Sequence, residues 1–425
     1  MTELEKARKE INLIDSEIAR LFAKRMDAVR GVAEYKKTHG LPVCDPLREE
    51  ALLASVEGAF DDPVYAKYYR ELLKKEIGLS KAFQHSLSGD LYVNTGNGGY
   101  EVVIARGGLD GLDKYLPNGI KTLVISDEGV PSEYVKKAAQ YCDNAEIALF
   151  PQGEKNKTPE TLKCLLQTLS KGGYDRASRV IAVGGGVVGD MAGLAASLYM
   201  RGIEFVNIPT TLLAQVDSCV GGKTGCDLDG VKNAFGTFYA PSKVIIDTET
   251  LQTLPRRHIA NGLAEALKAA LIGDPELFEA FENGDPFGIS YETVIRRALK
   301  VKISVVEADE KESGLRRALN LGHTIGHGIE SACGGGWLHG ECVAVGMLPV
   351  CSPGLRARLI PIYAKLGLPE SAACRADEVL RYCLNDKKAK DGGIITVRCD
   401  NPGEYRFVRV GEEKLRALIK QVVTE

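Results

Sequence analysis

The chain has 425 residues, of which 44% are hydrophobic and 26% charged, and this composition is typical of a folded protein. A chain of this length usually divides into two or three domains. Its formal net charge of −3 argues against general nucleic-acid binding. The charged first segment lacks an apolar signal core, and no stretch approaches the roughly 20 apolar residues of a membrane-spanning helix. We therefore expect a cytoplasmic protein that binds neither nucleic acid nor membrane.

Eleven cysteines are scattered along the chain without a CxxC pair. This distribution is typical of reduced thiols that pack as small apolar residues. The alternatives, a structural zinc site or a disulfide framework, usually come with regular cysteine spacing.

The first part of the chain has helical periodicity. Apolar residues recur at spacings of three and four between Leu4 and Lys37, which predicts one long amphipathic helix. A Gly-Leu-Pro break at 40–42 ends it. A second helix is expected from Pro46 and a third from about Pro63 to Gln84. We expect an all-α module over residues 1–86, followed by a polar, glycine-rich linker or domain entry over 87–99.

Residues 100–254 change to a different pattern. Short β-branched runs, which predict strands, alternate there with helical segments. The runs lie at 122–126, 146–150, 179–183, 204–208 and 243–247. This alternation indicates an α/β domain with a parallel sheet. Helical periodicity returns from about Pro255, so residues 255–425 are expected to form a helical domain.

A glycine-rich turn follows the third of these runs. Gly184, Gly185, Gly186 and Gly189 stand between a predicted strand and a predicted helix, where backbone N–H groups can approach a pyrophosphate. The turn is not the GxGxxG fingerprint, so a tight turn without a ligand stays an alternative. Two further signals lie near strand ends. Asp127 could accept hydrogen bonds from a ribose, and the charged run 151–157 could equally be a solvated loop.

Three of the six histidines lie close together in the sequence, at His323, His327 and His339. His323 and His327 are one helical turn apart, and such pairs are more often core or capping residues than ligands. The third histidine favours a metal site with one open position. Glu265, in an alanine- and leucine-rich helix, could supply a carboxylate, although periodicity alone does not identify it. Isolated basic residues in apolar surroundings could form an anion pocket if they converge.

Several segments together resemble the 3-dehydroquinate synthase family. They occur in the family's order and at similar spacing, and the resemblance covers nearly all of residues 91–425. The segments are 151–157, 184–190, 209–224, 262–268, 309–327 and 338–341. The resemblance implies a Rossmann-like domain followed by a helical domain. It also implies the conversion of 3-deoxy-arabino-heptulosonate 7-phosphate to 3-dehydroquinate, with NAD⁺ and a divalent metal, zinc or cobalt, as cofactors.

The resemblance also implies residue roles. The implied metal ligands are Glu265, His323 and His339, while His327 is placed near the substrate phosphate. The implied nucleotide contacts are Asp127, Glu154, Lys157, Gly185, Gly186, Val187, Asp190, Thr210 and Thr211. The implied substrate contacts are Asp217, Lys223, Lys232, Asn233, Lys268, Lys302, Arg316, Asn320 and Lys387. Arg201 resembles an arginine that reaches the substrate phosphate of a neighbouring subunit, which implies a homodimer or a higher homo-oligomer.

Two positions depart from the family's pattern. The stretch Cys226–Lys232 lacks the usual Asn-His-Pro before the Lys-Asn pair, and Gly129 stands where an asparagine is common near the adenosine. Both departures put local geometry in doubt.

Charged and polar residues stand at defined positions along the three helices of the first module: Arg8, Asp15, Arg25, Lys36, Asp45, Arg48, Glu49, Ser80 and Gln84. Taken as a set, they resemble the all-helical chorismate mutase family. The resemblance implies an intertwined dimer in which cationic and polar groups bind chorismate and stabilise the charge that develops during its rearrangement to prephenate. The implied contacts are Arg8, Arg25, Lys36, Asp45, Arg48, Glu49, Ser80 and Gln84. The alternative for each charged residue is that it lies on the solvated face of a coiled coil through which the chain dimerises.

Three other functions stay open. The first module could sense chorismate or prephenate without turning it over. The second part could be a related sugar-phosphate cyclase, or an NAD- and metal-dependent alcohol dehydrogenase.

Overall fold

The computed structural model describes residues 1–39, 41–95, 99–142, 144–310, 312, 314–385 and 393–424. The chain divides into two compact units, Met1–Glu101 and Val102–Glu425. Each unit is described by itself below.

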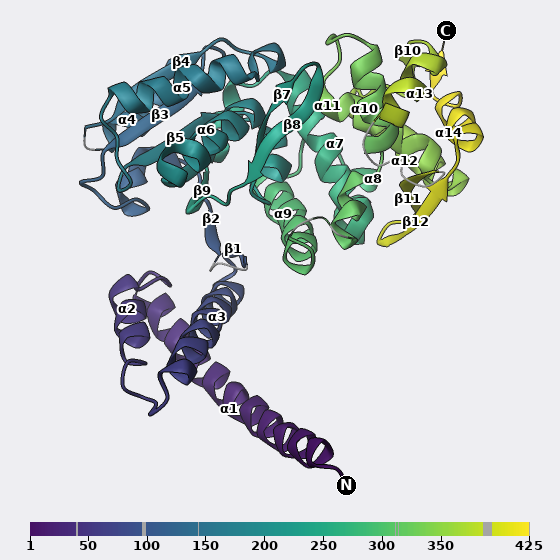
Figure 1. The fold of residues 1–425 in the computed structure, drawn as a ribbon. Helices are drawn as coiled ribbons and strands as arrows, with labels where there is room; N and C mark the ends of the chain where they lie inside the picture. Colours follow the sequence, from purple (N-terminus) through teal and green to yellow (C-terminus); the bar gives the residue numbers. More distant parts are fainter. Residues whose placement is uncertain are drawn as a thin grey trace. The chain divides into compact units, whose positions relative to one another are not determined.

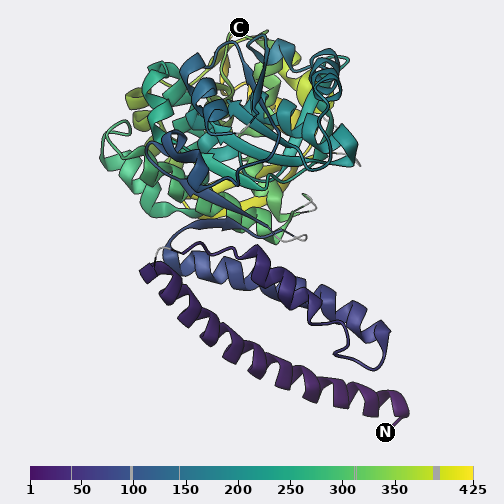
Figure 2. The ribbon, with the colours of Figure 1, turned by 90° about the vertical axis from the view of Figure 1, so that its left-hand side faces the viewer.

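The smaller unit consists of three helices and a short strand. The helices are α1 (Glu3–His39), α2 (Pro46–Ala54) and α3 (Pro63–Ser88), and strand β1 covers Leu91–Val93. Aspartates cap α2 and α3: Asp45 accepts a hydrogen bond from the Arg48 amide, and Asp62 accepts one from the Val64 amide. Figure 2 shows α1 as one long helix, and its C-terminal half contacts α3, where Arg25 donates a hydrogen bond to Ser80. The three predicted helices are present, and α3 continues past Gln84 to a left-handed glycine cap.

The larger unit begins with a mainly parallel sheet, seen at the left of Figure 1. Its strands are β2 (Tyr100–Ile104), β3 (Thr122–Asp127), β4 (Glu146–Phe150), β5 (Arg179–Gly184), β6 (Glu204–Pro209) and β9 (Lys243–Ile246). They lie in the order β2-β9-β6-β5-β3-β4, and the pairs from β9 to β4 are parallel. All five predicted strands are therefore confirmed.

The central strands β3 and β5 are buried on both faces, because successive side chains point to opposite faces and helices cover each face. Leu123 and Ile125 point to the face covered by α5 (Pro159–Lys171) and α6 (Gly186–Leu198). Val124 points to the opposite face, against α4 (Ser132–Gln140) and the 3-10 helix η1 (Gly108–Lys114). The carboxyl ends of parallel strands lie at one edge, so the segments after β3, β5 and β6 meet there.

The rest of the larger unit is mainly helical, as expected. Its helices are α7 (Arg256–Gly273), α8 (Pro275–Asn283), α9 (Tyr291–Ala308), α10 (His323–Ala332), α11 (His339–Met347), α12 (Pro353–Leu366), α13 (Ala376–Asn385) and α14 (Glu412–Ile419). The periodicity did not reveal the hairpin of β11 (Ile394–Asn401) and β12 (Glu404–Val410), nor the short parallel pair of β10 (Ala372–Ala373) and β13 (Val423–Thr424). Another hairpin, β7 (Lys223–Leu228) and β8 (Val231–Phe238), lies between the sheet strands β6 and β9 in sequence.

Helix α7 is the central helix of this part and is buried along most of its length. Small residues let its neighbours approach. A Cβ at Gly262 would lie 2.6 Å from the Leu213 amide nitrogen, and a Cβ at Gly340 would collide with the carbonyl of Asn261. The Gly340 amide instead donates a hydrogen bond to the Asn261 side chain at 2.6 Å. This contact fixes the first turn of α11 against α7.

Within the described residues, we find no helix that combines the length and the apolar character required to cross a bilayer.

Candidate functional site

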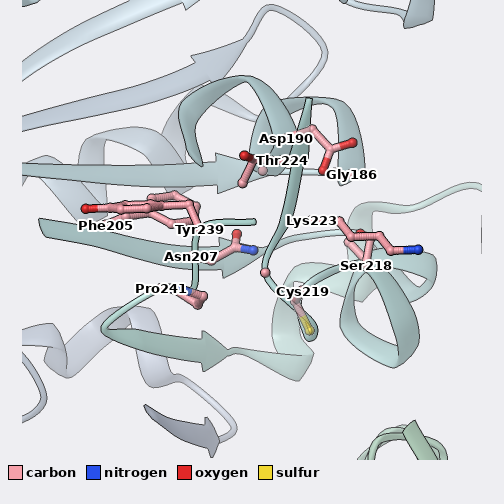
Figure 3. A pocket seen from close by; sticks show the side chains of 14 residues that line it. Gly186, Asp190, Phe205, Asn207, Ser218, Cys219, Lys223, Thr224, Tyr239 and Pro241 are labelled. Atoms are coloured by element: carbon pink, nitrogen blue, oxygen red, sulfur yellow. The ribbon is translucent and has the colours of Figure 1, made fainter. Parts of the chain in front are cut away.

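The glycine-rich turn lies at the sheet edge where β5 ends and α6 begins. Gly185 is the N-cap of α6 and Gly186 its first residue, so the first amides of this helix face the edge. A Cβ at Gly185 would lie 3.2 Å from the Thr211 methyl group, and one at Gly186 would lie 3.2 Å from the Ser218 hydroxyl. The two glycines therefore keep the backbone accessible, and a narrow pocket opens beside them (Figure 3).

Other predicted nucleotide contacts lie at the same edge. Asp127 ends β3, and its carboxylate accepts a hydrogen bond from the Gly129 amide at 2.9 Å. Burial raises the pKa of Asp127. Thr210 and Thr211 follow β6, and the Thr210 amide donates to the Gly184 carbonyl at 2.9 Å. Val187 lies in the first turn of α6, and Glu154 lies in the 3-10 helix η2 (Glu154–Asn156).

Lys157 joins this edge to the β7–β8 hairpin. Its buried ammonium contacts the Asp190 carboxylate at 2.6 Å and donates a hydrogen bond to the Asn233 side chain at 2.5 Å. The Lys157 carbonyl also accepts a hydrogen bond from the Asp227 amide at 2.8 Å. Burial lowers the pKa of Lys157, but Asp190 and Glu154 outweigh that effect and raise it. Lys157 therefore stays charged beside the glycine-rich turn.

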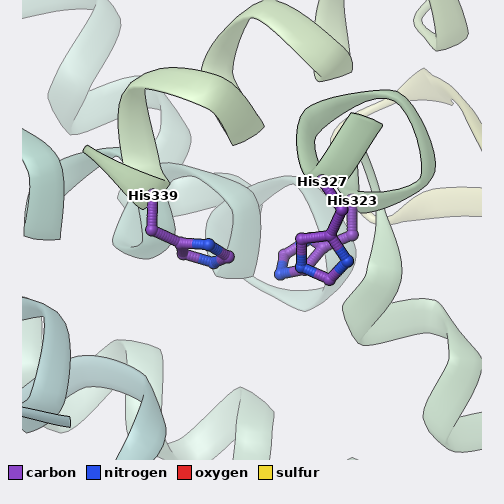
Figure 4. A group of neighbouring side chains, drawn as sticks. All are labelled: His323, His327 and His339. Carbon is purple, nitrogen blue, oxygen red and sulfur yellow. The ribbon is translucent and has the colours of Figure 1, made fainter. Parts of the chain in front are cut away.

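The three histidines of the predicted metal site converge, as Figure 4 shows. One ring nitrogen of each lies within 4.8 Å of the others. Glu265 approaches from α7: its Oε1 is 3.8 Å from the His323 Nε2 and 3.5 Å from the His339 Nε2. Glu265, His323 and His339 therefore lie around one point. His327 belongs to the same cluster, so the geometry alone does not separate ligands from substrate contacts.

The carboxylate of Glu265 suits a bound cation. Both of its oxygens are buried and lack a well-aligned hydrogen bond from the residues that the structure describes, although Lys268 forms an ion pair with it at 2.5 Å. Burial raises its pKa, but Lys268 and the two histidines lower it well below the ordinary range. For His323, burial and Lys268 lower the pKa well below its ordinary value, which keeps the imidazole neutral. A buried carboxylate and neutral imidazole nitrogen are ligands that zinc accepts.

Basic residues lie next to this cluster. Lys302 forms an ion pair with Asp217 at 2.9 Å, and Lys268 approaches the same carboxylate at 3.8 Å. Burial raises the pKa of Asp217, but these two lysines outweigh it and lower the pKa to about 2. The guanidinium of Arg316 donates to the carbonyls of Glu310 and Gly221 at 2.5 and 3.0 Å. Of the isolated basic residues of the sequence, Lys223, Lys302 and Arg316 thus lie together, as an anion pocket requires, whereas Arg201 does not join them.

A cavity of about 510 Å³ connects these groups. It reaches from Asp190, beside the glycine-rich turn, to the three histidines. Of the other predicted residues, it is lined by Asp217, Lys223, Asn233, Lys268, Lys302, Arg316 and Asn320. A cavity of this size can enclose a small polar molecule beside a nucleotide.

Two glutamates of the site were missed by the sequence reasoning. Glu312 contacts Lys223 at 2.5 Å and accepts a hydrogen bond from Asn320 at 3.0 Å. Glu330 contacts Lys232 at 2.8 Å and the His339 Nδ1 at 3.5 Å. Glu330 follows His323 by seven residues and His327 by three, so all three share one helix face. That spacing was a usable signal.

The structure gives a local account of both departures from the family's pattern. In the hairpin, Asp229 and Gly230 form a two-residue turn with φ values of 50° and 76°. Positive φ at both central residues is what a type I′ turn requires. At the other departure, a Cβ on Gly129 would overlap the side-chain amide of Gln152. Gln152 therefore fills the space that a larger residue at 129 would need.

Two of the predicted substrate contacts that the structure describes, Arg201 and Lys232, do not line this cavity. Arg201 ends the 3-10 helix η3 (Tyr199–Arg201), is exposed and has a φ of 69°. Lys387 lies outside the described residues.

The predicted chorismate contacts lie in the smaller unit. Arg25 donates to the hydroxyl of buried Ser80 and forms an ion pair with Glu76 at 3.5 Å. One turn further along α3, Gln84 is buried and its Oε1 lacks a hydrogen-bond partner among the described residues. The remaining predicted contacts are more dispersed. Lys36 donates to the Val43 carbonyl, and Glu49 forms an ion pair with Lys81. Asp45 caps α2 by accepting a hydrogen bond from the Arg48 amide, and Arg8 is exposed on α1.

Comparison with protein families matches three parts of the chain. Residues 147–261 match the family described as 3-dehydroquinate synthase N-terminal, and residues 262–389 match its C-terminal counterpart. Residues 7–85 match chorismate mutase type II. These matches confirm both resemblances and the fusion.

Individual relatives agree. The 3-dehydroquinate synthase of Pelobacter propionicus is 40% identical over 353 residues, which cover 77% of this chain and 98% of the relative. One similar solved structure is 2-deoxy-scyllo-inosose synthase complexed with carbaglucose-6-phosphate, NAD⁺ and Co²⁺. Its sequence is 27% identical and the TM-score is 0.73, and the match covers 78% of this chain and 100% of that synthase chain. The 2-epi-5-epi-valiolone synthase of Streptomyces hygroscopicus, with NAD⁺ and Zn²⁺, is 30% identical, with a TM-score of 0.70 and coverages of 76% and 96%. The chain therefore belongs to the 3-dehydroquinate synthase family and carries a chorismate mutase type II segment ahead of it.

Proposed function

We propose that residues 100–425 convert 3-deoxy-arabino-heptulosonate 7-phosphate to 3-dehydroquinate and phosphate. The observation that carries this proposal is the single cavity that joins the nucleotide-side Asp190 to the histidine cluster and to the buried lysines. A substrate bound there would lie between a hydride acceptor, a cation site and an anion pocket. The reaction needs all three.

NAD⁺ and a divalent metal are the proposed cofactors. Glu265, His323 and His339 would hold the metal, and the amides at Gly185 and Gly186 would face the nucleotide. When bound, NAD⁺ supplies a reversible hydride acceptor and the metal supplies a Lewis acid. The chain's own groups then bind and orient. Lys268, Lys302 and Arg316 hold the substrate's anionic groups, because buried cations favour anions in a cavity of low dielectric constant.

The experiment uses the purified full chain with NAD⁺, zinc or cobalt, and the heptulosonate phosphate. We expect dehydroquinate and inorganic phosphate in equal amounts. Release of neither product would contradict the assignment. Turnover of a different sugar phosphate in parallel incubations would favour a related cyclase, and net accumulation of NADH would favour a dehydrogenase.

We propose that the smaller unit converts chorismate to prephenate. Arg25 and Ser80 already contact one another, and Gln84 lies on the same helix as Ser80 with a buried acceptor that lacks a partner. Arg25→Ala in the full chain should abolish prephenate formation while dehydroquinate formation persists. If the wild-type chain binds chorismate but forms no prephenate, the module is a sensor.

The same proposal includes a homodimer or higher homo-oligomer in the cytoplasm. Its support is the apolar surface of α1, where Ile11, Ile14, Ile18 and Leu21 are all at least half exposed. Such a row is what a second copy would bury. All eleven cysteines are free thiols, as a reducing compartment would keep them.

A further inference from the structure

Glu330 is a half-buried carboxylate whose two oxygens face different partners. Its Oε2 lies 3.5 Å from the Nδ1 of His339, and its Oε1 lies 2.8 Å from the ammonium of Lys232. Its side chain is 16% exposed, so solvent screens these contacts only in part. The residue comes from α10, whereas His339 begins α11 and Lys232 lies on β8. Glu330 therefore connects three separate elements.

The imidazole of His339 stands between two carboxylates. Its Nε2 lies 3.5 Å from Glu265, and its Nδ1 faces Glu330. A carboxylate that accepts a hydrogen bond from the Nδ1–H group fixes the tautomer in which Nε2 carries the lone pair, and it also fixes the plane of the ring. The Nε2 is the atom that faces Glu265 Oε1, the same oxygen that lies 3.8 Å from the His323 Nε2. Without Glu330 the ring could rotate or change tautomer, and that lone pair would no longer be aimed at this point.

We propose that Glu330 is a positioning residue that orients His339 for metal binding and, through its other oxygen, holds Lys232. The inference rests on the proposed metal centre. It assigns Glu330 no contact with the metal, since its carboxylate lies on the Nδ1 side of His339.

The bulge in the hairpin explains why Lys232 can reach Glu330. Cys226 pairs with Phe235 and Leu228 pairs with Val231, so β8 carries extra residues between the two pairs. Lys232 and Asn233 lie in this bulge. Asn233 accepts from Lys157 at the nucleotide side, while Lys232 contacts Glu330 at the metal side. Glu330 thus ties one end of the bulge to the ring of His339.

The test measures metal affinity in the full chain by competition between Zn²⁺ or Co²⁺ and a chromophoric chelator. Removing a carboxylate that supports a metal-binding histidine weakens binding by roughly 10- to 100-fold. We expect that loss for Glu330→Gln, with an altered visible spectrum of the Co²⁺ protein and unchanged NAD⁺ affinity. Glu330→Asp, which keeps the charge but is one methylene too short, should also weaken binding. It keeps the inference testable if the glutamine variant does not fold.

Two comparisons separate positioning from general damage. Glu282→Gln removes a partly buried carboxylate paired with Arg358, remote from the cavity, and should leave metal affinity unchanged. In a His339→Ala background, Glu330→Gln should cause no further loss, because the ring on which it acts is gone. Wild-type affinity in Glu330→Gln, or an undiminished loss in the His339→Ala background, would overturn the inference. A wild-type chain that binds neither metal would overturn the proposed metal centre, and the inference with it.

Discussion

Lys302 contacts Asp217 through two different acceptors. Its ammonium donates to the backbone carbonyl of Asp217 at 2.6 Å and pairs with the carboxylate at 2.9 Å. Asp217 lies in the π-type turn η4 (Ala214–Ser218), and Lys302 lies on α9, so the pair joins the sheet side of the cavity to its helical side. Both side chains belong to the proposed substrate site.

Lys302→Met should destabilise the protein as well as reduce turnover. Removing one partner of a buried ion pair leaves the other charge poorly compensated and costs about 3–5 kcal/mol. We expect a value near the lower end, about 3 kcal/mol, because Lys268 still faces the Asp217 carboxylate. We expect this decrease in the free energy of unfolding by urea denaturation. The double variant Lys302→Met/Asp217→Asn should recover part of it, and full additivity of the two changes would contradict the coupling.

Gly129→Asn should impair NAD⁺ binding. The new side chain would compete with the Gln152 amide for the same space, and overpacking of this kind costs roughly 1–3 kcal/mol. We expect the Kd for NAD⁺, measured by calorimetry, to rise about tenfold. Adding Gln152→Ala should restore much of the affinity. An unchanged Kd in the single variant would show that Gln152 yields freely.

Gly230→Ala should strain the hairpin turn. An alanine at a φ of 76° costs about 1–2 kcal/mol, whereas Asp229→Asn retains a residue type that tolerates this region. We expect a lower Tm and a higher KM for the heptulosonate phosphate in Gly230→Ala, because Lys232 and Asn233 lie on the same hairpin. Asp229→Asn serves as the control, and equal behaviour of both variants would rule out turn strain.

Metal removal should separate the two activities. Dialysis against a chelator should abolish dehydroquinate formation and leave prephenate formation intact, since the proposed rearrangement needs no cofactor. Added zinc or cobalt should restore the first activity. Loss of both activities on metal removal would contradict the assignment of Glu265, His323 and His339 as a centre serving only the larger unit.

Glu282→Gln should lower stability only above acidic pH. Hydrogen bonds from Arg358 at 2.6 and 2.7 Å hold the pKa of Glu282 below its ordinary value. A depressed carboxylate pKa stabilises the fold above the unfolded-state pKa, and this contribution disappears as the pH falls through the folded-state pKa. Because Arg358 is 39% exposed, we expect only about 0.5 kcal/mol. Urea denaturation at pH 7 and below pH 4, with exposed Glu279→Gln as control, checks whether the difference vanishes in acid.

The sequence by itself determined the elements, because their signals are local. Short β-branched runs predicted the strands that end at Asp127 and Gly184, and helical spacing predicted α1. The glycine-rich turn and the histidine cluster were visible in the same way. Several motifs in the family's order then identified the 3-dehydroquinate synthase family. A set of charged and polar residues in the first module identified the chorismate mutase family. Local periodicity did not reveal the β7–β8 and β11–β12 hairpins, because β8 and β12 are mostly exposed and lack the continuous apolar runs of the buried parallel strands.

Only the tertiary structure decided which of these residues meet. Glu265 and His339 are far apart in the sequence, and their approach depends on the close packing of α7 and α11 at Gly340. The contacts of Glu330 with His339 and Lys232 likewise depend on a bulge and on two helices that no local pattern relates. A spacing can place side chains on one face of a helix, but the partner across that face is chosen by the packing of distant segments.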